Sequence, residues 1–495
     1  MLNLFLLLVF IVVVSTDDDT VESEETFQRF NVRSSDFAEI VSTASFVDKS
    51  MYIKTFVEDS GIVVITAPHR FGKSTNLNML KRFLEIEVDE EGIKKSKTKN
   101  IREPVRDTEN YALFVNNKLK IAMNETFMNY HFGKHPVISV DFEFDNIHVM
   151  SYDIAIDQVK YSIHRSFTEH HYLKKSDRLN SEEKMIVKNW CSTSGYSKMT
   201  ETEVTDSLRL LSRLLYRHYD NRRVYVLIDN FDLPAVNALL FAETEDIMGG
   251  IYRLISSVVL KVLQKNFHAH RGLISGISYI AGSPALYSLG YVSVCRFLED
   301  HSYAGFHGLT KNESIELFSR EVFNLSSVLM DLAETNYGGY QSCGNVTIYN
   351  LWSVIHLLLT KEARDYWAGP GMFFNLENLL RAPSIQKEII FLSKGMDRKV
   401  RLKKIYAPDD VIRLRDLILK PELHKDIHNA DLALAFLVEL GYLTYVPTAQ
   451  SFLGRKRVKI PNKEMRRHVL QQMKKYKKHY GAIEEQLGYA ARSVD

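Results

Sequence analysis

The segment Gly72-Lys73-Ser74-Thr75 contains the residue types that proteins use to hold phosphate groups and a magnesium ion. Backbone N–H groups of a loop that leads into a helix attract anions, because they lie at the positive end of the helix dipole. A lysine in this position reaches the terminal phosphates of a nucleotide, and a neighbouring hydroxyl binds Mg²⁺. We therefore predict that Gly72, Lys73, Ser74 and Thr75 bind the phosphates of ATP, with Ser74 also bound to Mg²⁺. The alternative is a chance Gly-Lys-Ser sequence at the start of a helix.

The residues just before this segment depart from the phosphate-binding pattern G-x-x-x-x-G-K-[ST], because Ala67 stands where the first glycine is expected. Glycine permits a positive φ and a close approach of the backbone. Alanine is tolerated at this position if residue 67 keeps a negative φ. Pro68 removes one N–H donor from the loop, and we expect Arg70 to offer a charge-assisted contact with phosphate in exchange.

A second part of such a site is an aspartate at the end of a neighbouring strand. The apolar run 224–228 is followed directly by Asp229, which we predict to contact Mg²⁺, through water. The alternative is an aspartate that merely ends a strand. Ser275 and Ser278 end another apolar run and are candidates for contacts with the γ-phosphate, although a serine in this position also commonly forms a turn.

Short apolar runs predict the strands that position these side chains. The predicted strands are residues 61–66, 135–144, 223–229 and 271–278. Helical patterns separate them, for example at residues 152–168, 203–218 and 247–265. Strands that alternate with helices indicate a parallel sheet. We therefore predict an α/β fold with a parallel-sheet P-loop NTPase core at residues 38–300, followed by a mostly helical region.

The second half has fewer strand signals. Helical patterns occur at 311–334, 348–364 and 373–393. An amphipathic helix at 430–440 precedes two short strand-like runs, YLTYV and RVKI. This order is typical of a winged-helix-like module, which we place at 411–470 after a helical extension at 301–410, with a role in packing against the core. Residues 471–495 form a basic C-terminal tail, either a solvated helix face or a docking surface for acidic partners.

The first residues, MLNLFLLLVFIVVVST, predict a signal peptide at 1–15, followed by a disordered acidic leader at 16–37. An uncleaved membrane anchor is the alternative. Sequons at Asn124, Asn312, Asn324 and Asn345 favour entry to the secretory pathway and a glycoprotein. We expect a protein that is secreted or resident in the lumen, with no stable membrane anchor after cleavage. The three cysteines allow one disulfide and one free thiol.

Length, composition and net charge exclude few classes of protein. The chain has 495 residues, of which 45% are hydrophobic and 25% are charged, as in ordinary globular proteins. A formal net charge of +2 makes no case for binding nucleic acid or an anionic membrane.

Several separate motifs, in the expected order, resemble the AAA-ATPase-like family across residues 38–470. They are FVDKSMYIK (46–54), APHRFGKSTNLNML (67–80), HPVISVDF (135–142), VLIDNFDLP (226–234), FHGLTKNE (306–313), NYGGYQS (336–342), VTIYNLWSVIHLL (346–358), ELGYLTYV (439–446) and KIPNKEMRR (459–467). The resemblance implies a P-loop ATPase domain with a helical extension. It gives a site rather than a biological role, because most members of this family are uncharacterised.

The chain departs from the family pattern at three places. Ala67 and His69 stand where the family usually has arginines, and Asn230 replaces a glutamate that would activate water. A carboxamide cannot accept a proton as a base, although it can orient a water molecule. Asp232 is a substitute base in one interpretation and an exposed turn residue before Pro234 in the other. We therefore expect a secreted protein that binds ATP and Mg²⁺ and hydrolyses ATP weakly or not at all. The alternatives are an active Mg²⁺-dependent ATPase and a nucleotide-free interaction protein or effector with an unknown protein partner.

Overall fold

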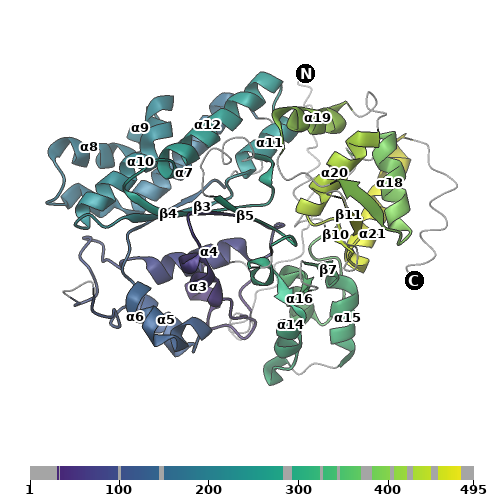
Figure 1. Cartoon of the computed structure of the whole chain (residues 1–495), viewed down its shortest axis with the longest axis horizontal. Helices are drawn as coiled ribbons and strands as arrows, with labels where there is room; N and C mark the ends of the chain where they lie inside the picture. Colours follow the sequence, from purple (N-terminus) through teal and green to yellow (C-terminus); the bar gives the residue numbers. More distant parts are fainter. Residues whose placement is uncertain are drawn as a thin grey trace, which may run out of the picture.

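A computed structural model describes residues 30–480 except 33, 99–101, 144–149, 282–291, 301, 324–326, 343–345, 369–378, 380–381, 402–405, 421–426 and 447–454. The first part of the chain forms an α/β unit around a parallel sheet, and the second part forms helices and small antiparallel sheets beside it (Figure 1). The predicted α/β core followed by a mostly helical region is thus confirmed.

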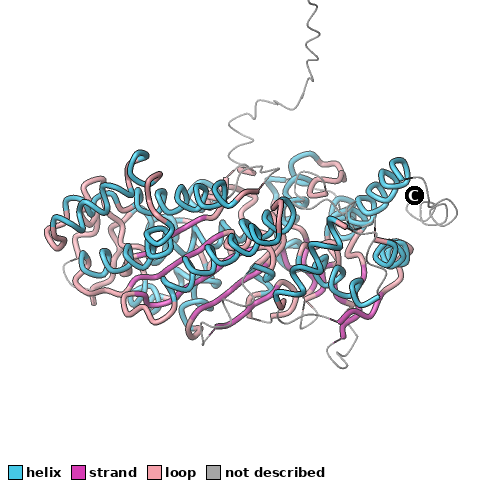
Figure 2. The backbone as a smooth tube through the Cα atoms, turned by 90° about the horizontal axis from the view of Figure 1, so that it is seen from above, coloured by secondary structure: helices cyan, strands magenta, loops and turns pink. Residues whose placement is uncertain are grey.

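The large sheet contains five strands in the order β2-β3-β4-β1-β5, all parallel. Their bounds are β1 Ile62–Thr66, β2 Val137–Asp141, β3 Val224–Asp229, β4 Ala269–Gly276 and β5 Val292–Arg296. Four of them are the strands predicted from apolar runs. The edge strand β5 was not predicted, because Ser293 and Arg296 interrupt its short apolar run. Figure 2 shows the strands of this sheet lying side by side, with helices around them.

Both faces of this sheet are buried, which explains why its strands read as continuous apolar runs. In β1, Ile62 and Val64 contact one hydrophobic cluster, while Val63 and Ile65 contact another on the opposite face. One face is covered by α3 Met51–Glu58, α4 Lys73–Leu84, α5 Glu109–Asn116 and α6 Glu125–His131. The other face is covered by α7 Tyr152–Glu169, α8 Ser181–Trp190, α9 Thr193–Tyr196, α10 Glu201–His218, α11 Leu233–Phe241 and α12 Glu245–Leu263 (Figure 1). Short helix α2 Phe37–Ile40 precedes both groups, and 3₁₀ turns lie at Lys120–Met123, His171–Lys175 and Tyr279–Ala281.

The second half begins with a small unit that has its own hydrophobic cluster. It contains the 3₁₀ turn Ala304–Phe306, β6 Leu309–Thr310, α14 Lys311–Phe318, the 3₁₀ turn Glu321–Phe323, α15 Ser327–Tyr337, β7 Tyr340–Gln341, β8 Thr347–Tyr349 and α16 Leu351–Thr360. The helical pattern predicted at 311–334 corresponds to two helices, α14 and α15, with the 3₁₀ turn Glu321–Phe323 between them. The helix predicted at 348–364 is partly wrong, because its first residues belong to β8.

The last unit shares its core with the face of the large sheet covered by α7 to α12. It contains α18 Pro383–Ser393, β9 Arg398–Arg401, α19 Pro408–Leu419, α20 Ile427–Glu439, β10 Thr444–Tyr445, β11 Arg455–Lys459 and α21 Lys463–Tyr480. The three strands form an antiparallel sheet in the order β10-β11-β9. The start of the helix predicted at 373–393 lies outside the described residues, and the rest is α18. None of the helices in the described part of the chain is both long and apolar enough to cross a lipid bilayer.

Two of the three cysteines, Cys191 and Cys295, carry free thiols. The three cysteines allow one disulfide, and Cys191 and Cys295 do not form it with each other. Cys343, the predicted signal peptide, most of the predicted acidic leader and the last fifteen residues lie outside the described residues.

Candidate functional site

The candidate site lies at the carboxyl ends of the inner strands of the large sheet. The chain leaves β1 at Thr66, passes through a loop and enters α4 at Lys73. We call residues 67–75 the phosphate loop. Ligands of open parallel sheets bind at this edge, because loops and helix N-termini converge there.

The backbone of the phosphate loop explains how alanine replaces the expected glycine. Ala67 is not among the residues with positive φ, and its N–H donates to the carbonyl of Gly276 on β4 at 3.0 Å. The left-handed conformations fall instead on Arg70, with φ of 62°, and on Gly72, with φ of 85°. The sequence-based condition that residue 67 avoids positive φ is therefore confirmed.

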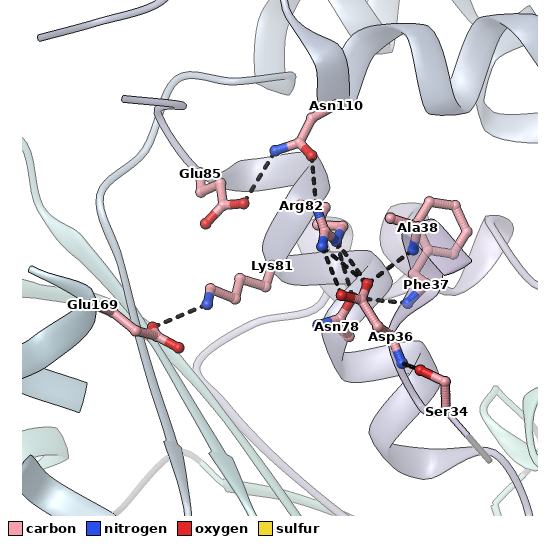
Figure 3. A network of polar contacts seen from close by, with 10 residues as sticks. All are labelled: Ser34, Asp36, Phe37, Ala38, Asn78, Lys81, Arg82, Glu85, Asn110 and Glu169. Carbon is pink, nitrogen blue, oxygen red and sulfur yellow. Dashed lines mark hydrogen bonds and ion pairs between the residues drawn. The ribbon is translucent and has the colours of Figure 1, made fainter. Parts of the chain in front are cut away.

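A polar network holds helix α4 in place behind the loop (Figure 3). Arg82 on α4 donates to both carboxylate oxygens of Asp36, each at 2.9 Å, and also contacts the side-chain oxygens of Asn78 and Asn110. Lys81 on the same helix forms an ion pair with Glu169 of α7 at 2.9 Å. The position of the helix N-terminus is thus fixed by contacts made two to three turns further along the helix.

Lys73 is buried, and its ammonium group donates to the carbonyl oxygens of Ala67 at 2.8 Å and Pro68 at 2.9 Å. Burial lowers the pKa of Lys73 to about 8, while the charges of Asp229 and Asp232 oppose this shift. The carbonyl oxygens of the loop therefore serve as hydrogen-bond partners of the Lys73 ammonium group, and the charges of Asp229 and Asp232 also act on it.

Three buried side chains have polar atoms without a hydrogen-bond partner: Thr66 Oγ1, Ser275 Oγ and both ring nitrogens of His307, whose ring lies close enough to Lys73 to be affected by its charge. Thr66 and Ser275 end or nearly end β1 and β4, which are paired. Burial, followed by the charges of Lys73 and Lys49, lowers the pKa of His307 to about 3, so its ring is neutral. Unpaired buried polar atoms are costly and call for a partner. A polar ligand at this strand edge fits them.

The oxygen ligands that Mg²⁺ prefers are also present. Asp229 is 4% exposed and ends β3, and Ser74 follows Lys73 in the first turn of α4. Among the described residues, no group of three or more His, Cys, Asp or Glu side chains converges as a metal site. Mg²⁺ commonly uses one or two protein oxygens together with water and substrate phosphates.

Asn230, the predicted water-orienting residue, faces a neighbouring strand. Its Nδ2 donates to Oδ1 of Asp141 at 2.8 Å, and its backbone has φ of 51°, which asparagine tolerates. Asp141 ends β2 and pairs in register with Asp229. Burial and the charge of Asp229 raise the pKa of Asp141 to about 6. The sequence motif showed Asp141 only as the end of a strand.

Asp232 is fully buried, so its interpretation as an exposed turn residue is wrong. Its carboxylate accepts the backbone N–H groups of Ile277, at 3.0 and 3.1 Å, and of Ser278, at 2.6 Å. Burial raises the pKa of Asp232 to about 6, although these hydrogen bonds and Lys73 favour the ionised form. Asp232 thus holds the chain that leaves β4, and both of its oxygens are engaged.

Ser278 lies beyond the end of β4, and its hydroxyl donates to Glu439 Oε2 at 2.5 Å. Glu439 is the last residue of α20. It also accepts hydrogen bonds from the backbone N–H of Tyr279 and the hydroxyl of Tyr406, each at 3.0 Å. Arg296, at the end of β5, lies 3.7 Å from the same carboxylate. The last unit of the fold is therefore fixed to the strand edge by a buried polar cluster rather than leaving Ser278 available for phosphate.

The outer side of the phosphate loop is covered by residues from the second half of the chain. The indole N–H of Trp367 donates to the carbonyl of His69 at 2.9 Å, and Arg70 lies over the ring of Trp352 at 3.7 Å. Phe71 is fully buried in contact with the rings of Phe297, Tyr340 and Trp367, and Gly441 lies against Pro68. Arg70, predicted to contact phosphate, is thus held by an aromatic ring. In the described part of the chain, Ser74 and Thr75 make no side-chain hydrogen bond.

Fold and site together define an α/β protein with a P-loop-like edge. Residues 32–114, which include β1, the phosphate loop and α4, match the protein family described as Predicted AAA-ATPase. This match supports an AAA-ATPase-like family for the chain, as the sequence motifs predicted, and it favours nucleotide binding. No curated protein and no solved structure matches the chain.

Proposed function

We propose that the protein binds ATP with Mg²⁺ at the phosphate loop and hydrolyses it slowly. The observation that carries this proposal is the position of Lys73, which lies at the start of α4 beside Asp229, at the sheet edge where Thr66 and Ser275, with unpaired hydroxyls, end or nearly end β1 and β4. A phosphate group would replace the carbonyls of Ala67 and Pro68 as partner of the ammonium group and would offer acceptors to the hydroxyls.

The residues divide into three roles in this proposal. Gly72, Lys73 and Thr75 bind the phosphates with the N–H groups of the α4 N-terminus. Ser74 and Asp229 hold Mg²⁺, which when bound neutralises charge on the phosphates. Ser275 contacts the γ-phosphate. Arg70 joins the phosphates only after it leaves the ring of Trp352.

Slow hydrolysis follows from the chemistry of the strand end. Asn230 lacks the carboxylate of the family's glutamate, and both carboxylate oxygens of Asp232 already accept backbone N–H groups. Of the two residues that the sequence offered as catalytic, Asn230 therefore cannot deprotonate a water molecule, and Asp232 has both carboxylate oxygens engaged elsewhere. General-base catalysis is typically worth about 10²- to 10⁴-fold.

One observation favours the nucleotide-free alternative, in which the protein acts only through protein contacts. The lysine is satisfied by its own loop, and the second half of the chain covers that loop through Trp367 and Phe71. Isothermal calorimetry with ATP and Mg²⁺ decides between the two functions. We expect saturable binding that requires Mg²⁺ and competes with ADP. An absence of heat, together with a melting temperature that ATP does not change, would favour the interaction protein.

We also propose that the protein is secreted and glycosylated and that residues 1–15 are removed. Asn312 is the exposed sequon in the first turn of α14, whereas the side chain of Asn124 caps α6 by accepting the N–H of Phe127. Intact mass before and after glycosidase treatment of protein from a secretory host tests this. Full-length chain in the membrane pellet would contradict cleavage and favour an anchor.

The last unit supports the proposal of a winged-helix-like module. Its elements follow the order helix, strand, helix, helix, strand, strand, from α18 to β11, and the strands form one antiparallel sheet. The buried cluster around Glu439 favours a role in packing against the core. Arg466 and Arg467 contact Ser393 and Asp365, while Lys474 and Lys475 further along α21 are exposed and offer a basic surface for an acidic partner.

A further inference from the structure

An open cavity of about 430 Å³ lies where the start of α3 meets the chain that follows β5. Its apolar lining residues include Met51, Ala304 and Phe306, and its charged ones include Lys49 and Glu313. We call it the Lys49 cavity. Its volume is within the range of about 300–1,000 Å³ that is usual for pockets that hold small molecules. The phosphate and metal contacts proposed above leave it unused.

Two hydrogen bonds fix the wall of the Lys49 cavity to the phosphate loop and to the helix that follows the loop. The side-chain amide of Asn76, in the first turn of α4, donates to the carbonyl of Phe306 at 2.9 Å. The N–H of Gly308 donates to the carbonyl of Phe71, in the loop, at 3.0 Å. The cavity and the loop are therefore neighbours, and residues 306–308 join them.

A third link is the ring of His307, which lies between these two bonds in the chain. The ring is close enough to Lys73 and to Lys49 for both charges to lower its pKa, after the larger effect of burial. Both ring nitrogens are buried without a hydrogen-bond partner. One unpaired polar ring is thus near both the lysine of the loop and the lysine of the cavity.

The proposed phosphate contacts set the direction in which a nucleotide extends from the loop. Its terminal phosphate lies with Lys73, Asp229 and Ser275 at the strand ends, so the other phosphates continue along the first turn of α4. The innermost phosphate then faces Thr75, and the nucleoside leaves the loop beside Asn76. Asn76 is the residue that binds the cavity wall.

The lining of the cavity suits a base and a ribose. Met51 and Phe306 can cover a base, because burial of apolar surface is favourable. Glu313 accepts hydrogen bonds from Lys49 and Thr310 through one oxygen, Oε2. In the part of the chain that the structure describes, its other oxygen, Oε1, accepts none. A carboxylate oxygen is a usual partner of ribose hydroxyls.

We propose that the Lys49 cavity holds the base and ribose of the nucleotide whose phosphates bind the phosphate loop. This inference rests on the proposed function, because it assigns the nucleoside part of that same ligand.

The test compares ATP with inorganic tripolyphosphate, which has three phosphate groups and no nucleoside. Calorimetry with Mg²⁺ gives the Kd of each ligand for the parent protein. Tripolyphosphate carries more negative charge, so contacts with the phosphates alone would favour it. We expect ATP to bind at least about tenfold more tightly, because the cavity buries apolar surface of the base.

A bulky side chain in the cavity should remove this advantage. Ser302 is an exposed lining residue, and Ser302→Trp should weaken ATP binding about tenfold, to the affinity of tripolyphosphate. Binding of tripolyphosphate should not change. Ser181→Trp is the matched control, because Ser181 is an exposed serine on α8, which covers the other face of the sheet. It should bind both ligands like the parent.

A second variant keeps the test decisive if Ser302→Trp does not fold, which the melting temperature without ligand reports. Met51→Ala removes apolar surface from the cavity wall and should weaken ATP binding about threefold to tenfold. Its affinity for tripolyphosphate should equal that of the parent. A similar loss of affinity for both ligands would mean that the variants disturb the loop, and it would overturn the inference.

The outcomes separate the inference from the proposed function. Equal affinities of the parent for ATP and tripolyphosphate, or a preference for ATP that both variants keep, overturn the inference alone. In those cases the loop still binds the phosphates. A parent that binds neither ligand removes the proposed function, and the inference with it.

Discussion

The two sides of the phosphate loop differ in how far their polar groups are satisfied. On the inner side, toward the strand ends, Thr66, Ser275 and His307 have buried polar atoms without partners. On the outer side, the loop carbonyl of His69 accepts the indole N–H of Trp367, and Arg70 lies over Trp352. On the inner side, polar atoms at the strand edge thus lack hydrogen-bond partners, whereas on the outer side the loop itself is covered by packing and hydrogen bonds. His356, which packs against Trp352, is a partly buried outer residue with an unpaired ring nitrogen.

This difference separates ligand binding from loop stability. A fold leaves buried hydroxyls unpaired only at a cost, which a ligand can repay. Aromatic contacts to Phe71 and hydrogen bonds to the loop backbone stabilise one loop conformation in the absence of ligand. We expect changes on the inner side to alter affinity and changes on the outer side to alter access and stability.

The largest expected effect is that of Lys73→Met on the inner side. The variant should bind ATP about 100-fold more weakly, because a charge-assisted hydrogen bond contributes about 1.5–3 kcal/mol. Calorimetry measures the affinity. Lys81→Met, on the same helix but paired with Glu169, should bind ATP like the parent. Since Lys73 is buried, the variant should also lose some stability, which thermal melting reports. Parent-like affinity in Lys73→Met would contradict the phosphate role.

The next largest effect is a pH dependence of the folding stability, caused by a buried carboxylate on the outer side of the loop. Glu464 on α21 accepts the N–H of Trp367 at 2.7 Å and the hydroxyl of Ser353 at 2.9 Å. Burial nevertheless raises the pKa of Glu464 to about 7, although these hydrogen bonds lower it. The folded state therefore keeps a proton that the unfolded state, with a pKa of about 4.3, releases.

The contribution of Glu464 to the free energy of unfolding should accordingly fall as the pH rises from about 4.3 to about 7, by up to about 4 kcal/mol at 1.36 kcal/mol per pKa unit. Other groups add slopes of their own, for example His307, whose lowered pKa has the opposite effect. The test is therefore the difference between variant and parent in urea titrations at pH 5, 6 and 7: the stability of Glu464→Gln relative to the parent should rise with pH. The exposed Glu362→Gln should show no such trend. A difference between Glu464→Gln and the parent that does not change with pH would contradict the raised pKa.

A smaller effect tests the unpaired hydroxyl directly. Thr66→Val keeps the side-chain shape and removes the hydroxyl, so the nucleotide-free protein should gain about 1 kcal/mol of stability. The same variant should bind ATP more weakly. Thr205→Val is the matched control, because the Thr205 hydroxyl donates to the carbonyl of Thr202 and accepts from Lys261. That control should lose stability. Destabilisation by Thr66→Val would mean that the hydroxyl already has a partner.

The smallest effect concerns access from the outer side. Trp352→Ala removes the ring under Arg70, a contact worth about 0.5–2 kcal/mol. Stopped-flow binding of a fluorescent ATP analogue should become roughly 2–10-fold faster. Trp352→Phe keeps an aromatic face and should behave more like the parent. An unchanged rate in Trp352→Ala would show that Arg70 does not limit entry.

The strands of the core and the inner side of the candidate site could be predicted from the sequence. Apolar runs that end in Thr66, Asp141 and Asp229 predicted buried strands, because both faces of this sheet are covered. The strand β5 escaped prediction, since a short edge strand with polar residues lacks that signal. The pairing of Asp141 with Asp229 depends on strand register, which no local pattern contains.

The outer side could not be predicted, because it depends on residues far apart in the chain. Trp352, Trp367 and Gly441 contact the loop only after the second half folds against the first. The burial of Asp232 depends in the same way on the chain beyond β4. The signal peptide, cleavage and glycosylation remain predictions.

The contact between Pro68 and Gly441 joins residues that are synthesised at very different times. At about 5–20 residues per second, translation of the intervening chain takes on the order of 20–70 s. For most of that interval β1 and the loop exist without Trp367, and for all of it without Gly441, to cover them. We expect ATP to reach the loop of the growing chain more easily than that of the finished protein. Nucleotide captured during synthesis would then leave more slowly than it entered, because the second half of the chain folds over the loop.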